Sequence, residues 1–226
     1  MAALPTLLSA GEPGRMTREI WQNLSGSKLS DFTASPQFWQ APSTVSTFVG
    51  AAAPRNTGSN FAARIRAYFI APVSGSYIFW IASDDDSELF LSPTSSKFLR
   101  VKIASMAGWV QPSSWDSKPS QKSAPVPLVA GQRYFIEALH KEGGGSDHLA
   151  IAWQVPGGTR QLIPASSPES YTTDPNDLDN DDLPDDWEKT YGFSLTARSA
   201  TLLETLSLIR ITNTVSRIVL APNPAI

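Results

Sequence analysis

The sequence lacks several features that would place it among familiar enzymes or membrane proteins. It contains no cysteine and only two histidines in 226 residues. The absence of cysteine excludes disulfide bonds and thiolate metal sites, but it does not exclude secretion. No apolar stretch approaches the roughly 20 residues that a membrane-spanning helix requires. The opening stretch, MAALPTLLSAGEPG, also lacks the basic region and long apolar region that typify a signal peptide.

Catalytic signatures are missing as well. The sequence contains no G-x-S-x-G elbow, no phosphate-binding loop and no dinucleotide fingerprint. The two histidines, His140 and His148, flank a glycine-rich stretch, and a third zinc ligand is not evident near them. The carboxylates of Asp84, Asp85 and Asp86 are too close in sequence to stand on opposite sides of a sugar ring, as glycoside hydrolysis requires. We therefore expect a protein that is not an enzyme.

The negative charge is concentrated in one short segment. The net charge is −3, yet residues Asp174 to Glu188 hold eight acids and no Lys or Arg. The rest of the chain carries 13 acids and 18 basic residues, which is not basic enough to indicate a nucleic-acid-binding protein.

What the sequence does contain is a pattern of short strands and turns. Arg64–Ala71 and Ser76–Ala82 are apolar and aromatic runs on either side of the turn sequence PVSG, and we expect them to form a hairpin. A second hairpin is predicted from Gln132–His140 and His148–Gln154, which flank the loop KEGGGSD. These runs, with no strong amphipathic helix among them, predict an all-β antiparallel sandwich with jelly-roll-like character.

Alternation along these strands predicts which side chains face the core. The inward residues of the later strands are expected to be Tyr134, Ile136, Ala138, Leu149, Ile151 and Trp153, and those of the strand after the aspartates Leu89 and Leu91. The segment Val101–Pro127 is rich in Ser, Pro and Lys, and we expect it to run over the sheet with Trp109 and Trp115 as anchors.

Composition divides the chain into four parts. We expect an irregular leader over residues 1–13, the sandwich over residues 14–171, an acidic linker over residues 172–193, and a poorly defined tail over residues 194–226.

The run Asp84–Asp86 has two interpretations. An aspartate run before a strand is often a solvated turn, because Asp accepts tight-turn geometry. Alternatively, adjacent carboxylates become favourable when a divalent cation lies between them, and calcium takes 6–8 hard oxygen ligands. One turn cannot surround such an ion, so a second loop must approach, and the glycine-rich loop before His148 is the candidate. Asp147 would add one more ligand from that loop.

Three stretches resemble the protective-antigen-type β-sandwich domain: MTREIWQNLSGSKLSDFTASPQF, FWIASDDDSELFLS and GQRYFIEALHKEGGGSDHLAIAW. The resemblance spans about Gly14 to Tyr171. It implies that an Asp–Asp pair, joined by a cis peptide bond, holds one calcium ion to which sugar hydroxyls bind directly. The pair falls on Asp84 and Asp85, with Asp86 as the alternative second member. A later loop is implied to complete the calcium site and shape the sugar site, and here it comprises Gly143, Gly144, Gly145, Ser146 and Asp147.

The acidic segment carries a second calcium motif. Counted from Asp177, oxygen-bearing side chains occupy positions 1, 3, 5, 9 and 12, which is the spacing of an EF-hand loop. The predicted ligands are Asp177, Asp179, Asp181, the carbonyl of Leu183, Asp185 and Glu188. The segment also resembles thrombospondin type-3-like repeats, and the alternative is a solvated acidic linker.

Three functions remain open from the sequence. The first is a calcium-dependent carbohydrate-binding or adhesion module of a secreted or cell-surface protein, part of a larger chain, with a glycan or surface polysaccharide as partner. The second is a structural spacer stabilised by calcium. The third is a targeting fragment of a larger glycosidase.

Overall fold

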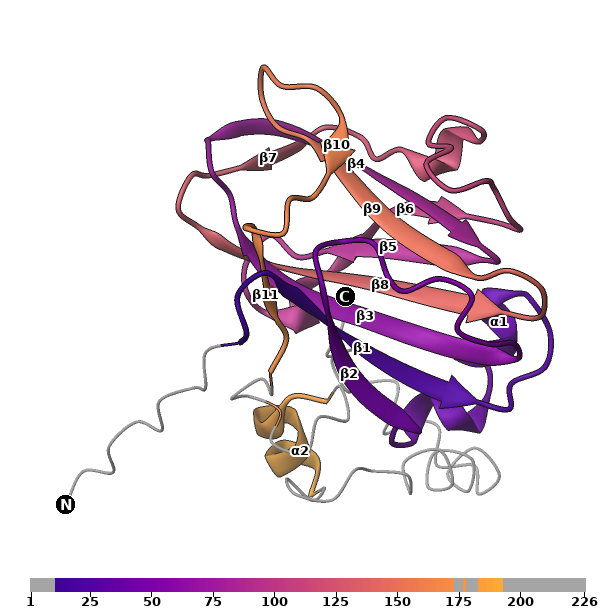
Figure 1. The fold of residues 1–226 in the computed structure, drawn as a ribbon. Coiled ribbons are helices and arrows are strands. Elements are labelled where there is room, and N and C mark those ends of the chain that lie inside the picture. Colours follow the sequence, from indigo (N-terminus) through magenta and orange to yellow (C-terminus); the bar gives the residue numbers. More distant parts are fainter. Residues whose placement is uncertain (1–10, 173–176, 178–182, 193–226) are drawn as a thin grey trace.

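Two antiparallel β-sheets pack face to face in the computed structural model, which describes residues 11–172, 177 and 183–192 (Figure 1). The large sheet has the strand order β2-β1-β3-β8-β5-β6, with β11 also paired to β3. The small sheet has the order β10-β9-β4-β7. The predicted all-β sandwich is therefore confirmed.

The strands of the large sheet are β1 (Arg15–Gln22), β2 (Thr44–Val49), β3 (Phe61–Ile70), β5 (Ser87–Leu91), β6 (Val101–Met106), β8 (Arg133–Glu142) and β11 (Pro168–Ser170). Those of the small sheet are β4 (Gly75–Asp84), β7 (Val126–Leu128), β9 (His148–Gln154) and β10 (Gln161–Leu162). Within the described residues, the helical elements are α1 (Leu29–Thr33), α2 (Asp185–Tyr191) and three short 3-10 turns, Pro36–Trp39, Lys97–Leu99 and Pro119–Gln121.

The main core lies between the two sheets. The inward residues predicted from alternation all belong to it: Leu89, Leu91, Tyr134, Ile136, Ala138, Leu149, Ile151 and Trp153. Trp153 is buried among aromatic rings, with Phe69 and Tyr77 at centroid distances of 5.6 and 5.7 Å. The period-2 pattern predicts this face correctly because successive side chains of a strand point to opposite sides.

Both predicted hairpins are wrong. β3 and β4 lie in different sheets, and so do β8 and β9, although each pair is joined by a short connection. β3 pairs instead with β8, from Phe61 opposite Glu142 to Ile70 opposite Arg133. Sheets of a sandwich are about 10 Å apart, so a connection of a few residues can cross between them. Turn chemistry alone does not distinguish this crossing from a hairpin.

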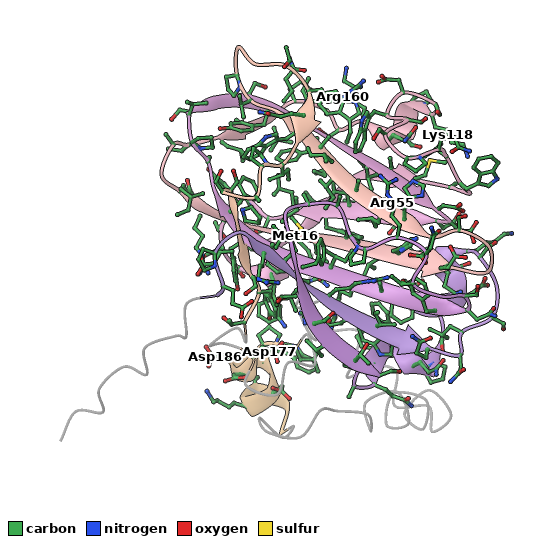
Figure 2. The ribbon with its side chains drawn as sticks, in the orientation of Figure 1. Met16, Arg55, Lys118, Arg160, Asp177 and Asp186 are labelled. Carbon is green, nitrogen blue, oxygen red and sulfur yellow. The ribbon has the colours of Figure 1, made fainter. Side chains whose placement is uncertain are left out.

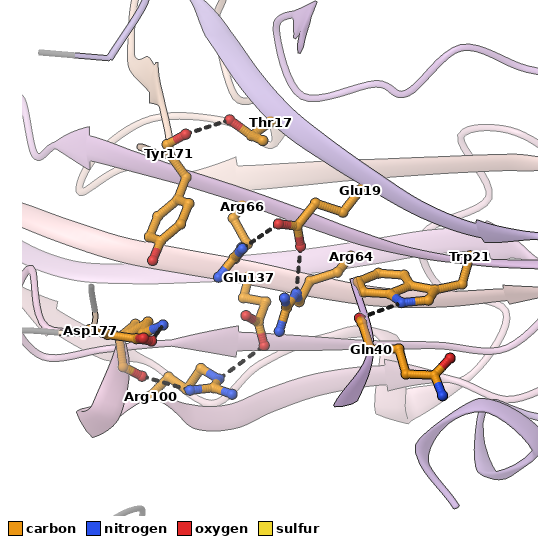
Figure 3. Close-up of polar contacts among 11 residues, drawn as sticks. Thr17, Glu19, Trp21, Gln40, Arg64, Arg66, Arg100, Glu137, Tyr171 and Asp177 are labelled. Carbon is orange, nitrogen blue, oxygen red and sulfur yellow. Dashed lines mark hydrogen bonds and ion pairs between the residues drawn. The ribbon is translucent and has the colours of Figure 1, made fainter. Parts of the chain in front are cut away.

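The outer face of the large sheet is also covered. Glu19 of β1 lies between Arg64 and Arg66 of β3, at 2.7 Å from Arg64 Nε and 2.5 Å from Arg66 Nη2 (Figure 3). The Arg66 guanidinium lies over the ring of Tyr171, 4.0 Å from its centroid. Because both faces of β3 are buried, nine of its ten residues are buried and the strand shows little alternation in burial.

The segment Val101–Pro127 is more regular than expected. It begins with β6, which extends the large sheet beside β5. Trp115 packs half-buried against the main core, whereas Trp109 is 59% exposed. Only Trp115 therefore acts as the predicted anchor. Among the described helices, none has the length and apolar character needed to cross a membrane.

Candidate functional site

The aspartate run forms a crossover between the two sheets at one end of the sandwich. Asp84 is the last residue of β4 in the small sheet, and β5 of the large sheet begins at Ser87. The peptide bond between Asp84 and Asp85 is cis, as the resemblance implies. Figure 1 shows α1 and the connection from β8 to β9 at this same end.

Backbone contacts hold the crossover against the end of β8. The amide of Lys141 donates to the carbonyl of Asp86 at 2.9 Å, and His140 Nε2 lies 2.8 Å from the carbonyl of Asp84. Burial lowers the pKa of His140 to about 4, so the ring is neutral near pH 7. Because a carbonyl can only accept, His140 donates from Nε2. The histidine is thus a support for the crossover.

Three carboxylates converge at this crossover. Oxygens of Asp84, Asp85 and Glu142 all lie within 4.8 Å of one another. Glu142, the last residue of β8, is fully buried, and neither of its carboxylate oxygens has a hydrogen-bond partner among the described residues. Burial, with the charges of Asp85 and Asp84, raises the pKa of Glu142 to about 7. Burial and the charge of Asp85 also raise the pKa of Asp84.

The charge of the nearby Lys141 acts to lower the pKa of Glu142, but burial and the neighbouring acids outweigh it. Lys141 is buried, and its Nζ donates to the backbone carbonyls of Leu24 at 2.7 Å, of Glu142 at 2.7 Å, and of Gly26. Within the described part of the chain, no ion pair joins Lys141 to the carboxylates. A buried, unpaired carboxylate is costly, and a cluster of hard oxygens is the ligand type that calcium takes. The residues present therefore fit a divalent cation.

Glu142 is the member of this cluster that the sequence prediction missed. It is an even number of residues from Tyr134, Ile136 and Ala138, so it lies on the same face of β8, and it directly precedes the glycine-rich loop. Continuing the inward face of β8 to the strand's end would have placed its carboxylate at the end of the core.

Asp86 has a different role from its two neighbours. Its Oδ2 accepts from the amide of Leu29 in α1 at 3.2 Å, and its Oδ1 accepts from the amide of Gly108. Asp86 thus ties α1 and the loop after β6 to the crossover. Its carboxylate is outside the three-acid cluster, which contains Asp84 and Asp85.

The glycine-rich loop approaches the cluster as expected. The amide of Gly143 donates to Asp85 Oδ2 at 3.0 Å, and a Cβ on Gly143 would lie only 3.0 Å from the carbonyl oxygen of Gly26. A side chain at Gly143 would crowd this approach. The next three residues, Gly144, Gly145 and Ser146, are exposed.

Asp147 is buried and braces a neighbouring loop. Its carboxylate accepts from the amides of Thr57 and Gly58, the latter at 3.2 Å, and from the Thr57 hydroxyl at 3.1 Å. The second loop was expected to supply Asp147 to the metal. In the structure, the acid that this region brings to the cluster is Glu142.

A pocket of about 220 Å³ adjoins the cluster at Asp84. Four segments build it: the loop after β2, the end of β4, the loop after β6, and the end of the glycine-rich loop with the start of β9. Its lining includes Arg55, Asn56, Asp84, Trp109, Ser146 and His148. Figure 2 shows Arg55 at this end of the molecule, near the start of β9.

Only part of the predicted acidic calcium loop lies within the described residues. Asp177 is buried and forms an ion pair with the buried Lys97. Glu188 is also buried, in α2, whereas Asp179 and Asp181 lie outside the described residues. The EF-hand-like loop stays a prediction.

Two curated relatives match parts of the chain. A mouse N-acetyl-beta-glucosaminyl-glycoprotein 4-beta-N-acetylgalactosaminyltransferase 1 is 28% identical over 167 residues, which cover 70% of this chain and 16% of that enzyme. Dog fibrocystin is 31% identical over 107 residues, covering 43% of this chain and 3% of that protein. The chain therefore spans a small fraction of the relatives it matches.

Solved structures share the fold at low sequence identity. The PA14 domain of the antifreeze protein MpAFP superposes with a TM-score of 0.54 at 13% identity, covering 77% of this chain and all of that one. The PA14 sugar-binding domain of an RTX adhesin gives 0.50 at 12% identity, over 71% of this chain and all of that one. The Epithelial Adhesin 6 A domain of Candida glabrata, solved with Galb1-3GlcNAc, gives 0.50 at 14% identity, over 75% of this chain and 92% of that one. The PA14 domain family itself matches residues 12–167, and the chain therefore belongs to that family.

Proposed function

We propose that this protein is a calcium-dependent carbohydrate-binding or adhesion module of a secreted or cell-surface protein. The observation that carries the proposal is the buried carboxylate of Glu142, which has no hydrogen-bond partner among the described residues and faces Asp84 and Asp85. Such a group is stabilised when a cation binds it, because the cation offsets both the desolvation and the mutual repulsion of the acids.

Asp84, Asp85 and Glu142 would hold the ion, and the loop at Gly143 would close over it. Bound calcium supplies a centre on which sugar hydroxyls, as hard oxygens, replace water. Asp84 lies in both the cluster and the adjoining pocket, so a sugar on the ion would extend into that pocket. The exposed Trp109 offers an apolar ring at the pocket wall, against which a sugar face can stack.

The similarities support a binding module. The RTX adhesin domain is described as sugar-binding, and the Candida adhesin was solved with a disaccharide. Fibrocystin and the mouse glycosyltransferase are far longer than this chain, which supports a place within a multidomain protein. A catalytic role is not proposed, because the chain matches only 16% of the glycosyltransferase.

A glycan array probed with the full-length chain tests the proposal. We expect binding in calcium that is lost with a chelator, lost in Asp85→Ala, and weakened at least tenfold in Trp109→Ala. The matched control is Asp116→Ala, because Asp116 is an exposed acid that pairs with Arg160 away from the cluster.

Two results would contradict the proposal. Glycan binding that is indifferent to the chelator would exclude calcium dependence. If calcium raises the melting temperature while no glycan binds, the protein is instead the structural spacer.

A further inference from the structure

Arg55 is unusual among the arginines of the described residues. It is exposed, it lines the pocket beside Asp84, and no hydrogen bond, ion pair or ring contact engages its guanidinium within the described chain. The other described arginines all have such partners: Arg15, Arg18, Arg64, Arg66, Arg100, Arg133 and Arg160. A guanidinium is suited to bidentate pairing with an anionic group, and here that capacity is unused.

The loop that carries Arg55 is held in place. Ala53 donates its amide to the carbonyl of Leu149 at 2.9 Å, and Asn56 donates to the carbonyl of Asp147 at 3.0 Å. The buried carboxylate of Asp147 also binds the amides of Thr57 and Gly58. Contacts on both sides of Arg55 therefore fix the backbone from which its side chain reaches the pocket.

A second polar group in the pocket has no partner. His148 is 4% exposed, and its Nε2 makes no hydrogen bond to any described residue. The same histidine lines the pocket. A buried polar atom left without a partner is unfavourable, so a small turn of the ring that brings Nε2 to the pocket surface would let a bound ligand satisfy it.

Charge decides which ligand fits these groups best. A divalent ion would offset two of the three negative charges of the cluster that includes Asp84. The carboxylate of Asp147, which also lines the pocket, is already hydrogen-bonded to the amides of Thr57 and Gly58. Arg55 is then the charged side chain of the pocket wall that has no hydrogen-bond or ion-pair partner among the described residues. An anionic substituent on the sugar would pair with Arg55 in a partly enclosed site, where such pairs are stronger than on an open surface.

We propose that the pocket prefers glycans that carry an anionic group, a carboxylate or a sulfate, over their neutral counterparts. Arg55 binds the anionic group, and His148 Nε2 forms a hydrogen bond to the same sugar. The proposal rests on the proposed function, since it names the ligand class of that site.

Binding of the full-length chain in saturating calcium to matched glycans tests this. The pairs are glucuronate against glucose, sialyllactose against lactose, and sulfated against unsulfated lactose, so that carboxylate and sulfate are separated. We expect at least tenfold tighter binding of one anionic class, falling as ionic strength rises. Arg55→Gln is expected to bring the anionic-to-neutral affinity ratio to about one. Arg160→Gln, which alters an exposed arginine paired with Asp116, keeps the ratio.

The outcomes distinguish the proposed preference for anionic glycans from the proposed calcium-dependent glycan binding on which it rests. Calcium-dependent binding of neutral and anionic glycans with equal affinity overturns the preference and leaves the proposed function intact. An anionic preference that survives in Arg55→Gln overturns the role of Arg55. If no glycan of either class binds, both proposals fail. The melting temperature of Arg55→Gln serves as a folding control, because this side chain makes no contact that folding depends on.

Discussion

Two regions of this protein bury carboxylates, and the charges around the buried group have opposite signs in the two regions. On the outer face of the large sheet, Glu19 lies between the guanidiniums of Arg64 and Arg66. At the end of the sandwich, Glu142 is equally buried but faces the like charges of Asp84 and Asp85. The first arrangement has its counter-charges within the chain, whereas no described residue forms an ion pair with the second.

The contrast separates an acid whose counter-charge lies within the chain from one that we propose binds a cation. Burial acts to raise the pKa of Glu19, but Arg66 and Arg64 outweigh it, and the pKa is lowered. Burial acts on Glu142 in the same direction, and there the neighbouring acids add to it, so the pKa is raised to about 7. The sign of the shift reports whether the chain itself supplies the counter-charge.

The largest effect is expected from removing the partnered acid. Glu19→Ala should lower the free energy of unfolding by about 3–5 kcal/mol, because it leaves two buried guanidiniums without their carboxylate. Urea unfolding with and without calcium should show the same loss in both conditions. A loss below about 1 kcal/mol would mean that the ion pairs contribute little beyond the desolvation they require.

Calcium should stabilise the unpartnered cluster. At a hundredfold excess over its dissociation constant, calcium is expected to raise the free energy of unfolding by about 2.7 kcal/mol. Glu142→Gln should bind calcium at least tenfold more weakly, since it loses one ligand charge. Calorimetric titration measures the affinity, and Asp116→Asn is the matched control. If the wild type is equally stable in calcium and in chelator, the three-acid cluster does not bind calcium and its contrast with Glu19 has no functional meaning.

The pH dependence of the calcium-free protein should differ in sign between the two regions. The pKa of Glu142 is about 7 when folded against an ordinary value of 4.5, so stability should fall as pH rises between about 4.5 and 7. Glu19, with its lowered pKa, should lose its contribution as pH falls below about 4.5.

Melting temperatures measured in chelator should fall by a few degrees as the pH rises from about 4.5 to about 7. Glu142→Gln should remove that fall in melting temperature and leave the loss of stability below about pH 4.5 unchanged. A decline that persists in this variant would assign the titration to another group.

The smallest effect should come from an exposed pair. Lys102 and Glu88 lie 2.9 Å apart on β6 and β5, with about half of the lysine side chain exposed. Glu88→Gln should change the free energy of unfolding by less than about 0.5 kcal/mol, since solvent and salt screen the pair. Urea unfolding at low and high salt measures it, and a cost near that of Glu19→Ala would show that burial is not what separates the two regions.

The sequence predicted local features well and non-local ones poorly. Alternation identified the inward residues of β8 and β9, and the aspartate run marked one end of the sandwich. The same reasoning wrongly joined β3 to β4 and β8 to β9 as hairpins. It named Asp147 as the acid of the second loop and did not identify Glu142, whose place beside Asp84 and Asp85 depends on the packing of β8 against the crossover.

The sequence by itself determined which side of each strand faces the core, through its period of two. It also determined that acids gather at Asp84–Asp86 and that the glycine-rich loop is free to approach them. Only the tertiary structure decided how the three aspartates divide, with Asp84 and Asp85 meeting Glu142 while Asp86 binds the amides of Leu29 and Gly108. The physical reason is that periodicity is fixed by bonds between neighbouring residues, whereas the partners of a carboxylate come from segments far apart in the chain. The choice between two nearby acids then depends on which amides and charges the packed sheets bring to each.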